Sequence, residues 1–191
     1  MSRSRIAAAT TRLVDVEGRS FRVCDGLFDE RTIREIHELV RACPFLLNNA
    51  DSPDDAFNLR WKSEFTAEQC ARHRFFADVL ALIGEEFSGR DLQLDRIYAN
   101  ANAFGDLFYP HTDGDSGREG ITALYFANLR WDLEWGAETS FYAAGEPAYV
   151  VAPRPGRMLV FDAKLTHRGA APTRPTPEPR WSIAFKISDR P

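Results

Sequence analysis

The sequence predicts a mainly β fold with α-helices, a sandwich or jelly roll whose N-terminal helices pack on the outer face of one sheet. Two patterns carry this expectation. Residues from about 25 to 90 show helical periodicity, whereas residues from about 91 to 188 form short strand-like runs at near-regular spacing. The 191 residues lie within the range of one domain, so we expect a single unit over 1–191 in which the helices bury their apolar stripes on a sheet.

Composition limits the partners and the location of the protein. A hydrophobic share of 44% with 14 Phe and 4 Trp favours a folded chain. The formal charge is −4 and the arginines are scattered, which argues against nucleic acid as a partner. No apolar run is long enough for a signal peptide or a membrane span, and Cys24, Cys43 and Cys70 lack disulfide or metal-ligand spacing. We therefore expect a cytoplasmic protein with reduced thiols and no membrane partner.

The helical part begins with a short strand and continues with two helices. Ser20–Cys24 alternates like a strand. Asp29 is suited to cap a helix that ends before Pro44, because the residues between them repeat apolar positions at a spacing of three to four. A capping box at Thr66 starts a second amphipathic helix, which we expect to run without a break toward Gly89.

The β part consists of runs rich in β-branched and aromatic residues, separated by Gly, Pro and Asp. These runs are Leu92–Asn100, Ile121–Asn128, Glu138–Tyr142, Ala148–Val151, Arg157–Asp162 and Trp181–Ile187. Two further segments are expected to be loops. The prolines of Ala171–Pro179 exclude a helix and a central strand, and Asn48–Asn58 is rich in turn-forming residues.

Three residues combine the ligand types of a transition-metal site. His111 and Asp113 are two positions apart, and in an extended segment such residues point to the same side. His167, on a turn after an apolar strand, supplies a second imidazole. Two histidines and one carboxylate form the facial triad of non-haem iron(II) oxygenases. His37 and His73 lie in helical segments, where a packed or solvated histidine is the simpler interpretation.

The motifs around this set resemble the prolyl-hydroxylase-like branch of the iron(II)/2-oxoglutarate oxygenases, over roughly residues 92–187. They comprise, in order, Arg96–Asn100, Gly105, the string His111-Thr112-Asp113, Thr122–Asn128, Trp131, Trp135–Glu138, Pro155-Gly156-Arg157, Phe161, His167 and Arg180-Trp181-Ser182. Ala137 departs from the pattern, since the family usually has a second glycine there. The departure touches a turn and not a ligand.

The resemblance implies a double-stranded β-helix that binds Fe(2+) through His111, Asp113 and His167 and uses 2-oxoglutarate and O2 as cosubstrates. The family also has an Arg-x-Ser pair, matched here by Arg180 and Ser182. A guanidinium is a planar fork that suits a carboxylate, so Arg180 is expected to hold the distal carboxylate of 2-oxoglutarate, with Ser182 adding a hydrogen bond.

Other residues are weighed for the same cosubstrate. Tyr98 and Asn100 lie on one face of their strand and are expected to reach 2-oxoglutarate from the wall opposite Arg180. Arg168 and Arg174 are poorer candidates for the anchor. Arg168 is too close to the metal ligand, and Arg174 lies inside the proline-rich loop.

The resemblance implies oxidation of a C–H bond with release of succinate and CO2. Asp113 favours hydroxylation, because halogenating relatives lack this carboxylate. A small or amino-acid-like substrate is expected, since the compact length leaves little room for a separate peptide-binding domain. Asn48–Lys62 is expected to act as a lid over the site, with an ordinary exposed connection as the alternative.

Two other functions remain open at this point. A cupin-type iron dioxygenase would use the same three ligands without 2-oxoglutarate, and it would have no need of Arg180. A non-catalytic jelly-roll protein that binds or senses a ligand would keep the fold and the metal site.

Overall fold

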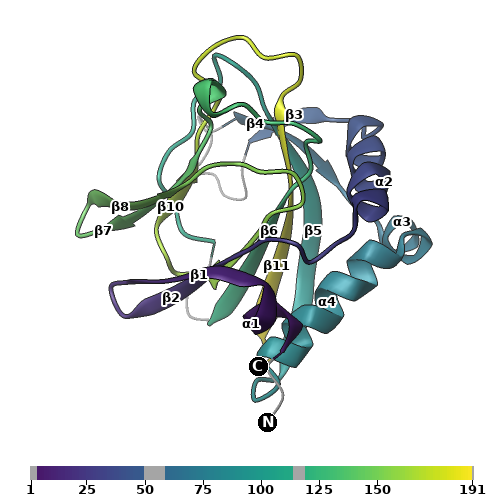
Figure 1. Cartoon of the computed structure of the whole chain (residues 1–191), viewed down its shortest axis with the longest axis vertical. Helices are drawn as coiled ribbons and strands as arrows, with labels where there is room; N and C mark the ends of the chain where they lie inside the picture. Colours follow the sequence, from purple (N-terminus) through teal and green to yellow (C-terminus); the bar gives the residue numbers. More distant parts are fainter. Residues whose placement is uncertain (1–3, 50–58, 114–118, 191) are drawn as a thin grey trace.

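The computed structural model describes residues 4–49, 59–113 and 119–190, and within them it contains two antiparallel sheets. The larger, eight-stranded sheet has the order β1-β2-β9-β6-β11-β5-β4-β3, and the smaller has the order β10-β7-β8. The strands are β1 (Thr10–Val16), β2 (Arg19–Cys24), β3 (Leu46–Asn49), β4 (Leu59–Glu64), β5 (Leu92–Asn102), β6 (Gly120–Phe126), β7 (Thr139–Ala143), β8 (Glu146–Val151), β9 (Met158–Asp162), β10 (His167–Gly169) and β11 (Arg180–Asp189). This arrangement confirms the predicted jelly roll (Figure 1).

Alternation along the central strands divides the interior into two cores. On β11, Ile183 and Phe185 face the helices, whereas Ala184 belongs to the cluster between the two sheets. On β5, Ile97 faces the helices and Tyr98 faces the second sheet. Because side chains alternate across a strand, each central strand contributes one row of residues to the helix-facing core and one row to the space between the sheets.

The helices cover the outer face of the larger sheet, as predicted (Figure 1). They are α1 (Arg5–Ala9), α2 (Glu30–Arg41), α3 (Ala67–Arg72) and α4 (Arg74–Glu86), with a 3-10 turn at Leu133–Trp135. Asp29 caps α2 by accepting a hydrogen bond from the Thr32 backbone N–H. Phe76 and Val79 of α4 pack in the same cluster as Phe185.

The prediction of one unbroken second helix is wrong. The capping box at Thr66 is present, but it starts a short helix, α3, that ends at Arg72. His73 has φ −123° and ψ 111°, extended values that interrupt the helix before α4 begins. Because of the break, α3 and α4 need not share one axis. Phe75 and Phe76 of α4 are buried, whereas none of the α3 residues is.

Several strands were missed by the sequence analysis: β1, β3, β4 and β10. The predicted loop Asn48–Asn58 begins inside β3, and the proposed lid Asn48–Lys62 ends inside β4, while its middle, 50–58, lies outside the described residues. β3 and β4 pair with each other and β4 pairs with β5, so both ends of that segment are part of the large sheet. By contrast, 171–179 joins β10 to β11 as an irregular and largely exposed connection, as predicted.

Within the described part of the chain, none of the helices is both long and apolar enough to cross a membrane.

Candidate active site

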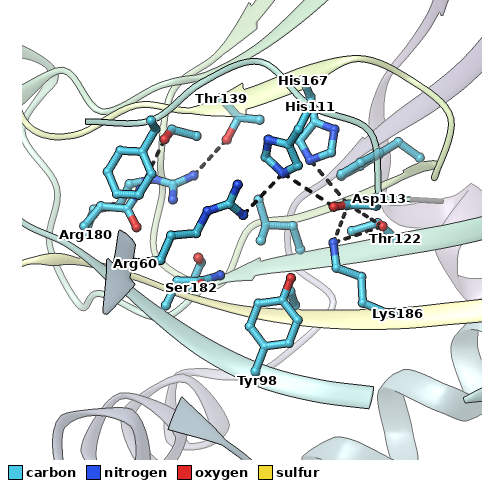
Figure 2. Close-up of a pocket in the computed structure, with 17 residues that line it drawn as sticks. Arg60, Tyr98, His111, Asp113, Thr122, Thr139, His167, Arg180, Ser182 and Lys186 are labelled. Carbon is cyan, nitrogen blue, oxygen red and sulfur yellow. Dashed lines mark hydrogen bonds and ion pairs between the residues drawn. The ribbon is translucent and has the colours of Figure 1, made fainter. Parts of the chain in front are cut away.

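A pocket with a cavity volume of about 50 Å³ lies between the two sheets. Its walls come from β4, β5, β6, β9 and β11 of the large sheet, from β7 and β10 of the small one, and from the segment that precedes β6. The residues lining it are Arg60, Tyr98, Asn100, Asn102, Phe108, His111, Asp113, Thr122, Leu124, Thr139, Phe161, His167, Gly169, Arg180, Ser182, Ala184 and Lys186. All seven residues predicted to form the site are among them (Figure 2).

A backbone bridge brings the two histidines together. His111 and His167 each donate a backbone N–H to the carbonyl of the other at 2.9 Å. His167 therefore lies in a short strand, β10, and not on a turn as predicted. The two imidazole rings are 4.6 Å apart between centroids. The bridge places both rings on the same side, facing the pocket.

The remaining ring nitrogens are fixed by the backbone. Nδ1 of His111 is 3.0 Å from the Tyr109 carbonyl, and Nδ1 of His167 is 2.9 Å from the Leu165 carbonyl. A carbonyl only accepts, so each Nδ1 carries a proton, and in the neutral form of either ring the lone pair is on Nε2. Such a partner on the second nitrogen is usual for metal-ligating histidines.

Asp113 completes a cluster of three ligand groups. Its backbone N–H donates to the Ala163 carbonyl at 2.8 Å, which holds the residue beside the end of β9. The carboxylate oxygens lie 3.5 Å from Nε2 of His111 and 3.3 Å from Nε2 of His167. The ligand atoms of the three residues all lie within 4.8 Å of one another, close enough to share one metal ion.

Two neighbours on the large sheet hold the Asp113 carboxylate in place. The Thr122 hydroxyl donates to Oδ2 at 2.7 Å, and the Lys186 ammonium forms an ion pair with the same oxygen. Burial alone would raise the pKa of Asp113, but the Lys186 and His167 side chains hold that pKa well below its usual range. Burial also lowers the pKa of His111. At neutral pH the site thus offers a carboxylate and a neutral His111 ring, the forms that bind metals.

Arg180 lies at the other end of the pocket and is 2% exposed. Its Nη2 donates to the Thr139 hydroxyl at 2.8 Å, and the guanidinium packs over the Phe126 ring. Gly169 allows this packing, because a Cβ there would lie 3.3 Å from Nη1 of Arg180. Burial lowers the pKa of Arg180 to about 10, so it stays charged at neutral pH.

Buried polar atoms around Arg180 have no hydrogen-bond partner. They are Nε of Arg180, Oγ of Ser182 and Oδ1 of Asn100. Among the residues the structure describes, no carboxylate lies within ion-pair distance of Arg180. A buried cation without an anionic partner is costly, and Arg180 Nε and Ser182 Oγ can both donate a hydrogen bond, so this end of the pocket suits an anion. Asn100 Oδ1 only accepts and does not add to this preference.

Tyr98 and Asn100 are in the pocket but not on the wall opposite Arg180. β5 pairs directly with β11, in a register that places Asn100 beside Ser182 and Tyr98 beside Ala184. Both residues therefore belong to the same wall as Arg180, which corrects the sequence-based expectation. The sequence showed which face of the strand they share but not which strand lies beside it.

Five pocket residues with polar contacts were not predicted: Arg60, Asn102, Thr122, Thr139 and Lys186. Lys186 lies on the same face of β11 as Arg180 and Ser182, four positions after Ser182, so strand alternation was a usable signal. Thr122 faces the pocket from β6 by the same rule. Arg60 was assigned to a lid, and the pairing of β4 with β5 puts it at the pocket wall instead.

The arginines that were poorer candidates lie elsewhere. Arg174 is exposed and forms an ion pair with Glu134 at 3.0 Å. Arg168 does not line the pocket, because its neighbours His167 and Gly169 occupy the inward positions of β10. Of the three arginines considered, Arg180 is the one that faces the pocket.

Residues outside the pocket account for other sequence features. Trp131 and Trp135 pack edge to face with ring centroids 5.2 Å apart, as expected for residues that pack within the connection between β6 and β7. Ala137, where the resemblance would have a glycine, has φ 63° and is fully buried. A left-handed backbone explains why glycine suits this position, and Ala137 adopts it with some strain.

Comparison with known families and structures agrees with this geometry. Residues 96–187 match the family model described as the 2OG-Fe(II) oxygenase superfamily. A search of curated proteins by sequence gave no significant match.

Solved structures share the fold at low sequence identity. An oxidoreductase of the 2OG-Fe(II) oxygenase family from Burkholderia pseudomallei is 17% identical, with a TM-score of 0.68 over 88% of this chain and 84% of that one. A prolyl hydroxylase from Trichoplax adhaerens, in complex with a peptide fragment of hypoxia inducible factor, is 16% identical, with a TM-score of 0.67 over 88% and 83%. The epimerase SnoN from nogalamycin biosynthesis is 16% identical, with a TM-score of 0.65 over 88% and 78%.

The family match covers the strands that build the pocket except β4, and the jelly roll of the solved structures is the fold observed here. Enzymes of this family use Fe(2+) and 2-oxoglutarate. Residues 96–187 of this chain are thus similar to the 2OG-Fe(II) oxygenase superfamily.

Proposed function

We propose that the protein is a non-haem Fe(II)/2-oxoglutarate-dependent dioxygenase that hydroxylates a C–H bond of a small or amino-acid-like substrate. The proposal rests on a pocket whose two ends differ. One end holds the cluster of His111, Asp113 and His167, and the other end holds the buried Arg180. The first end suits a metal and the second suits an anion.

The donor set fits iron(II). Nε2 of His111, Nε2 of His167 and one oxygen of Asp113 would hold the metal as a facial triad. The backbone carbonyls on both Nδ1 atoms orient the rings, and Thr122 with Lys186 orients the carboxylate.

The other end fits the distal carboxylate of 2-oxoglutarate. Arg180 Nε and Ser182 Oγ are buried without partners, and each would donate a hydrogen bond to that carboxylate. Asn100 and Tyr98 complete the wall beside them. Iron(II) and 2-oxoglutarate, when bound, supply the oxidation with O2 and release succinate and CO2. The protein's part is to position both and to exclude water from the buried end.

The same observation weighs against the alternatives. A cupin-type dioxygenase without 2-oxoglutarate would leave the buried Arg180 cation and the Ser182 hydroxyl without a ligand. A non-catalytic sensor is less well supported, because all three metal-binding side chains are present with their supporting contacts. The presence of Asp113 also favours hydroxylation over halogenation.

The proposal also includes the class of substrate and a cytoplasmic location. The polar lining and the position of the pocket between two sheets support a small or amino-acid-like substrate. The three cysteines are free, two of them only partly buried, which is compatible with a reducing cytoplasm.

The test is oxygen-dependent conversion of 2-oxoglutarate to succinate by the iron-loaded protein, including the slow reaction without a primary substrate. The wild type should form succinate in step with O2 uptake, and Asp113→Ala should not. Asp91→Ala, at an exposed residue that does not line the pocket, is the matched control. Succinate formation that survives Asp113→Ala unchanged would reject the proposal.

A further inference from the structure

Arg60 is the one charged side chain of the pocket for which the proposed function leaves no partner. It comes from β4, which lies outside the region of the family match, and it extends its guanidinium toward His111 (Figure 2). Asp113 and Lys186 pair with each other, and Arg180 faces the distal carboxylate in the proposed function. Arg60 remains.

The contacts of Arg60 show that its present hydrogen bonding is incomplete. Nε is buried and has no partner. Nη1 lies 3.5 Å from Nε2 of His111, the atom that would bind iron(II). Once the metal takes that lone pair, Nη1 has no acceptor among the described residues either. A partly buried guanidinium with both groups unpaired requires an acceptor from a ligand.

The charge of the pocket also favours an anionic ligand. Among the described residues, the lining holds three cationic side chains, Arg60, Arg180 and Lys186, and one carboxylate, that of Asp113, so these residues together carry two net positive charges. Iron(II) adds two positive charges and 2-oxoglutarate removes two. The loaded pocket is thus still cationic by two charges, and in a poorly solvated site such an excess favours a negatively charged ligand.

We infer that Arg60 binds an anionic group of the primary substrate, so that the enzyme acts on a carboxylic acid or a similar anion held beside the metal. This inference rests on the proposed function and specifies its substrate class. Arg60 reaches His111 at the metal end of the pocket, whereas Arg180 lies at the other end, so the two guanidiniums serve two different anions. The fork of Arg60 would fix the substrate's acid group and orient the adjacent carbon atoms toward the metal.

The test compares acids with their neutral amides. The protein is loaded with Zn(II), which does not support oxidation, and with 2-oxoglutarate. The probes are the common L-amino acids, their N-acetyl derivatives and straight-chain carboxylic acids, each with its primary amide. Binding is measured by the shift in melting temperature and by calorimetric titration. At least one acid should bind about 10-fold or more tightly than its amide, since charge-assisted hydrogen bonds are worth more than neutral ones.

Variants test whether Arg60 causes the preference for acids over amides. Arg60→Gln should bind acid and amide equally, and Arg60→Lys should keep part of the preference because it keeps the charge without the fork. Arg12→Gln removes the same charge from an exposed position on β1 and should behave as the wild type. A pocket that prefers no acid over its amide, or a preference that survives Arg60→Gln, overturns the inference.

One further measurement separates this inference from the proposed function. Arg60→Gln should still take up iron(II) and show the visible absorption band that 2-oxoglutarate produces anaerobically. A wild type without the band contradicts the proposed function. A wild type that shows the band but binds acids and amides equally contradicts the role of Arg60 alone.

Discussion

At the scale of single residues, the cluster of His111, Asp113 and His167 owes its geometry to backbone contacts. The reciprocal backbone bridge between the histidines and the hydrogen bond from the Asp113 N–H to Ala163 are independent of any ligand. The site is therefore largely preformed, which lowers the entropic cost of binding a metal.

Arg180 is expected to hold 2-oxoglutarate, and its replacement should show it. Arg180→Ala should weaken 2-oxoglutarate binding by about 30-fold or more, because truncating one partner of a buried charge pair costs roughly 2–5 kcal/mol. Iron(II) binding should change little. Arg180→Lys should be only a partial rescue, since an ammonium lacks the planar fork. Titration of the iron-loaded protein with 2-oxoglutarate gives the affinities.

Arg168→Ala and Arg174→Ala are the controls for that titration, because Arg168 does not line the pocket and Arg174 pairs with Glu134. The assignment fails when either control lowers the 2-oxoglutarate affinity more than Arg180→Ala does.

Thr122 gives a test of how the carboxylate ligand is oriented. Thr122→Val keeps the shape of the side chain but removes the hydroxyl that donates to Asp113 Oδ2 at 2.7 Å. The affinity for iron(II) should fall by about 10-fold, the lower end for losing such a supporting contact. Thr122→Ser should restore the affinity, because it keeps the hydroxyl. Equal affinities of the valine variant and the wild type would show that Lys186 alone orients Asp113.

At the scale of secondary-structure elements, an ion pair joins β2 to β9 at the edge of the helix-facing core. Arg157, which precedes β9 and is 4% exposed, donates from Nε and Nη2 to the two oxygens of Asp25 at 2.8 Å each. Asp25 follows Cys24, the last residue of β2, and Cys24 pairs with Met158 of β9. The contact therefore closes the end of this strand pair.

The pair should make stability depend on pH. The hydrogen bonds from Arg157 lower the pKa of Asp25. A carboxyl with a lowered pKa contributes stability above its unfolded pKa of about 3.9, and the contribution is lost as the pH falls through the folded value. Asp25→Asn should reduce the free energy of unfolding at pH 7 by about 1–2 kcal/mol, a range that allows for the partial exposure of the carboxylate. Below about pH 4 the difference should shrink.

Urea denaturation of the wild type and Asp25→Asn between pH 7 and pH 3 measures this difference. Asp91→Asn is the control, because Asp91 belongs to an exposed pair with Arg190 and its replacement should change stability by less than about 0.5 kcal/mol. A difference between wild type and Asp25→Asn that stays constant with pH would contradict the linkage.

The elements also show where prediction from sequence reached its limit. The long strands β5, β6 and β11 were predicted because their apolar residues are dense and alternate. β10 was missed since three residues, His167 to Gly169, carry no periodicity and become a strand only by pairing with β7. β4 was missed because its polar sequence LRWKSE resembles a loop, and its pairing with β5 is decided by contacts distant in sequence.

At the scale of the whole molecule, two hydrophobic cores pack on the two faces of the large sheet. Aromatic residues of α4 pack against Phe185 on one face of the large sheet, while Phe141 and Phe161 pack between the sheets beside the pocket. The inner rows of β5, β6 and β11 turn polar at the pocket, where Asn100, Thr122 and Ser182 replace apolar residues. Packing on both sides keeps these polar strands in register, so the site is held by rigid elements.

The site was predicted more completely than the fold. All seven residues predicted for the site line one pocket, because the prediction rested on residue type and spacing, which the sequence displays. The wall on which Tyr98 and Asn100 lie, and the presence of Arg60, depend on strand order, which the sequence does not display locally.

The central claim is that the cluster of His111, Asp113 and His167 binds iron(II) and admits 2-oxoglutarate. The most direct measurement is anaerobic titration of the protein with iron(II) and then 2-oxoglutarate, followed by visible absorption and metal analysis. We predict one iron per chain and a weak visible band on adding 2-oxoglutarate, both lost in the double variant His111→Ala/His167→Ala. Stoichiometric iron retained by the double variant, or a wild type that takes up no iron, would contradict the account.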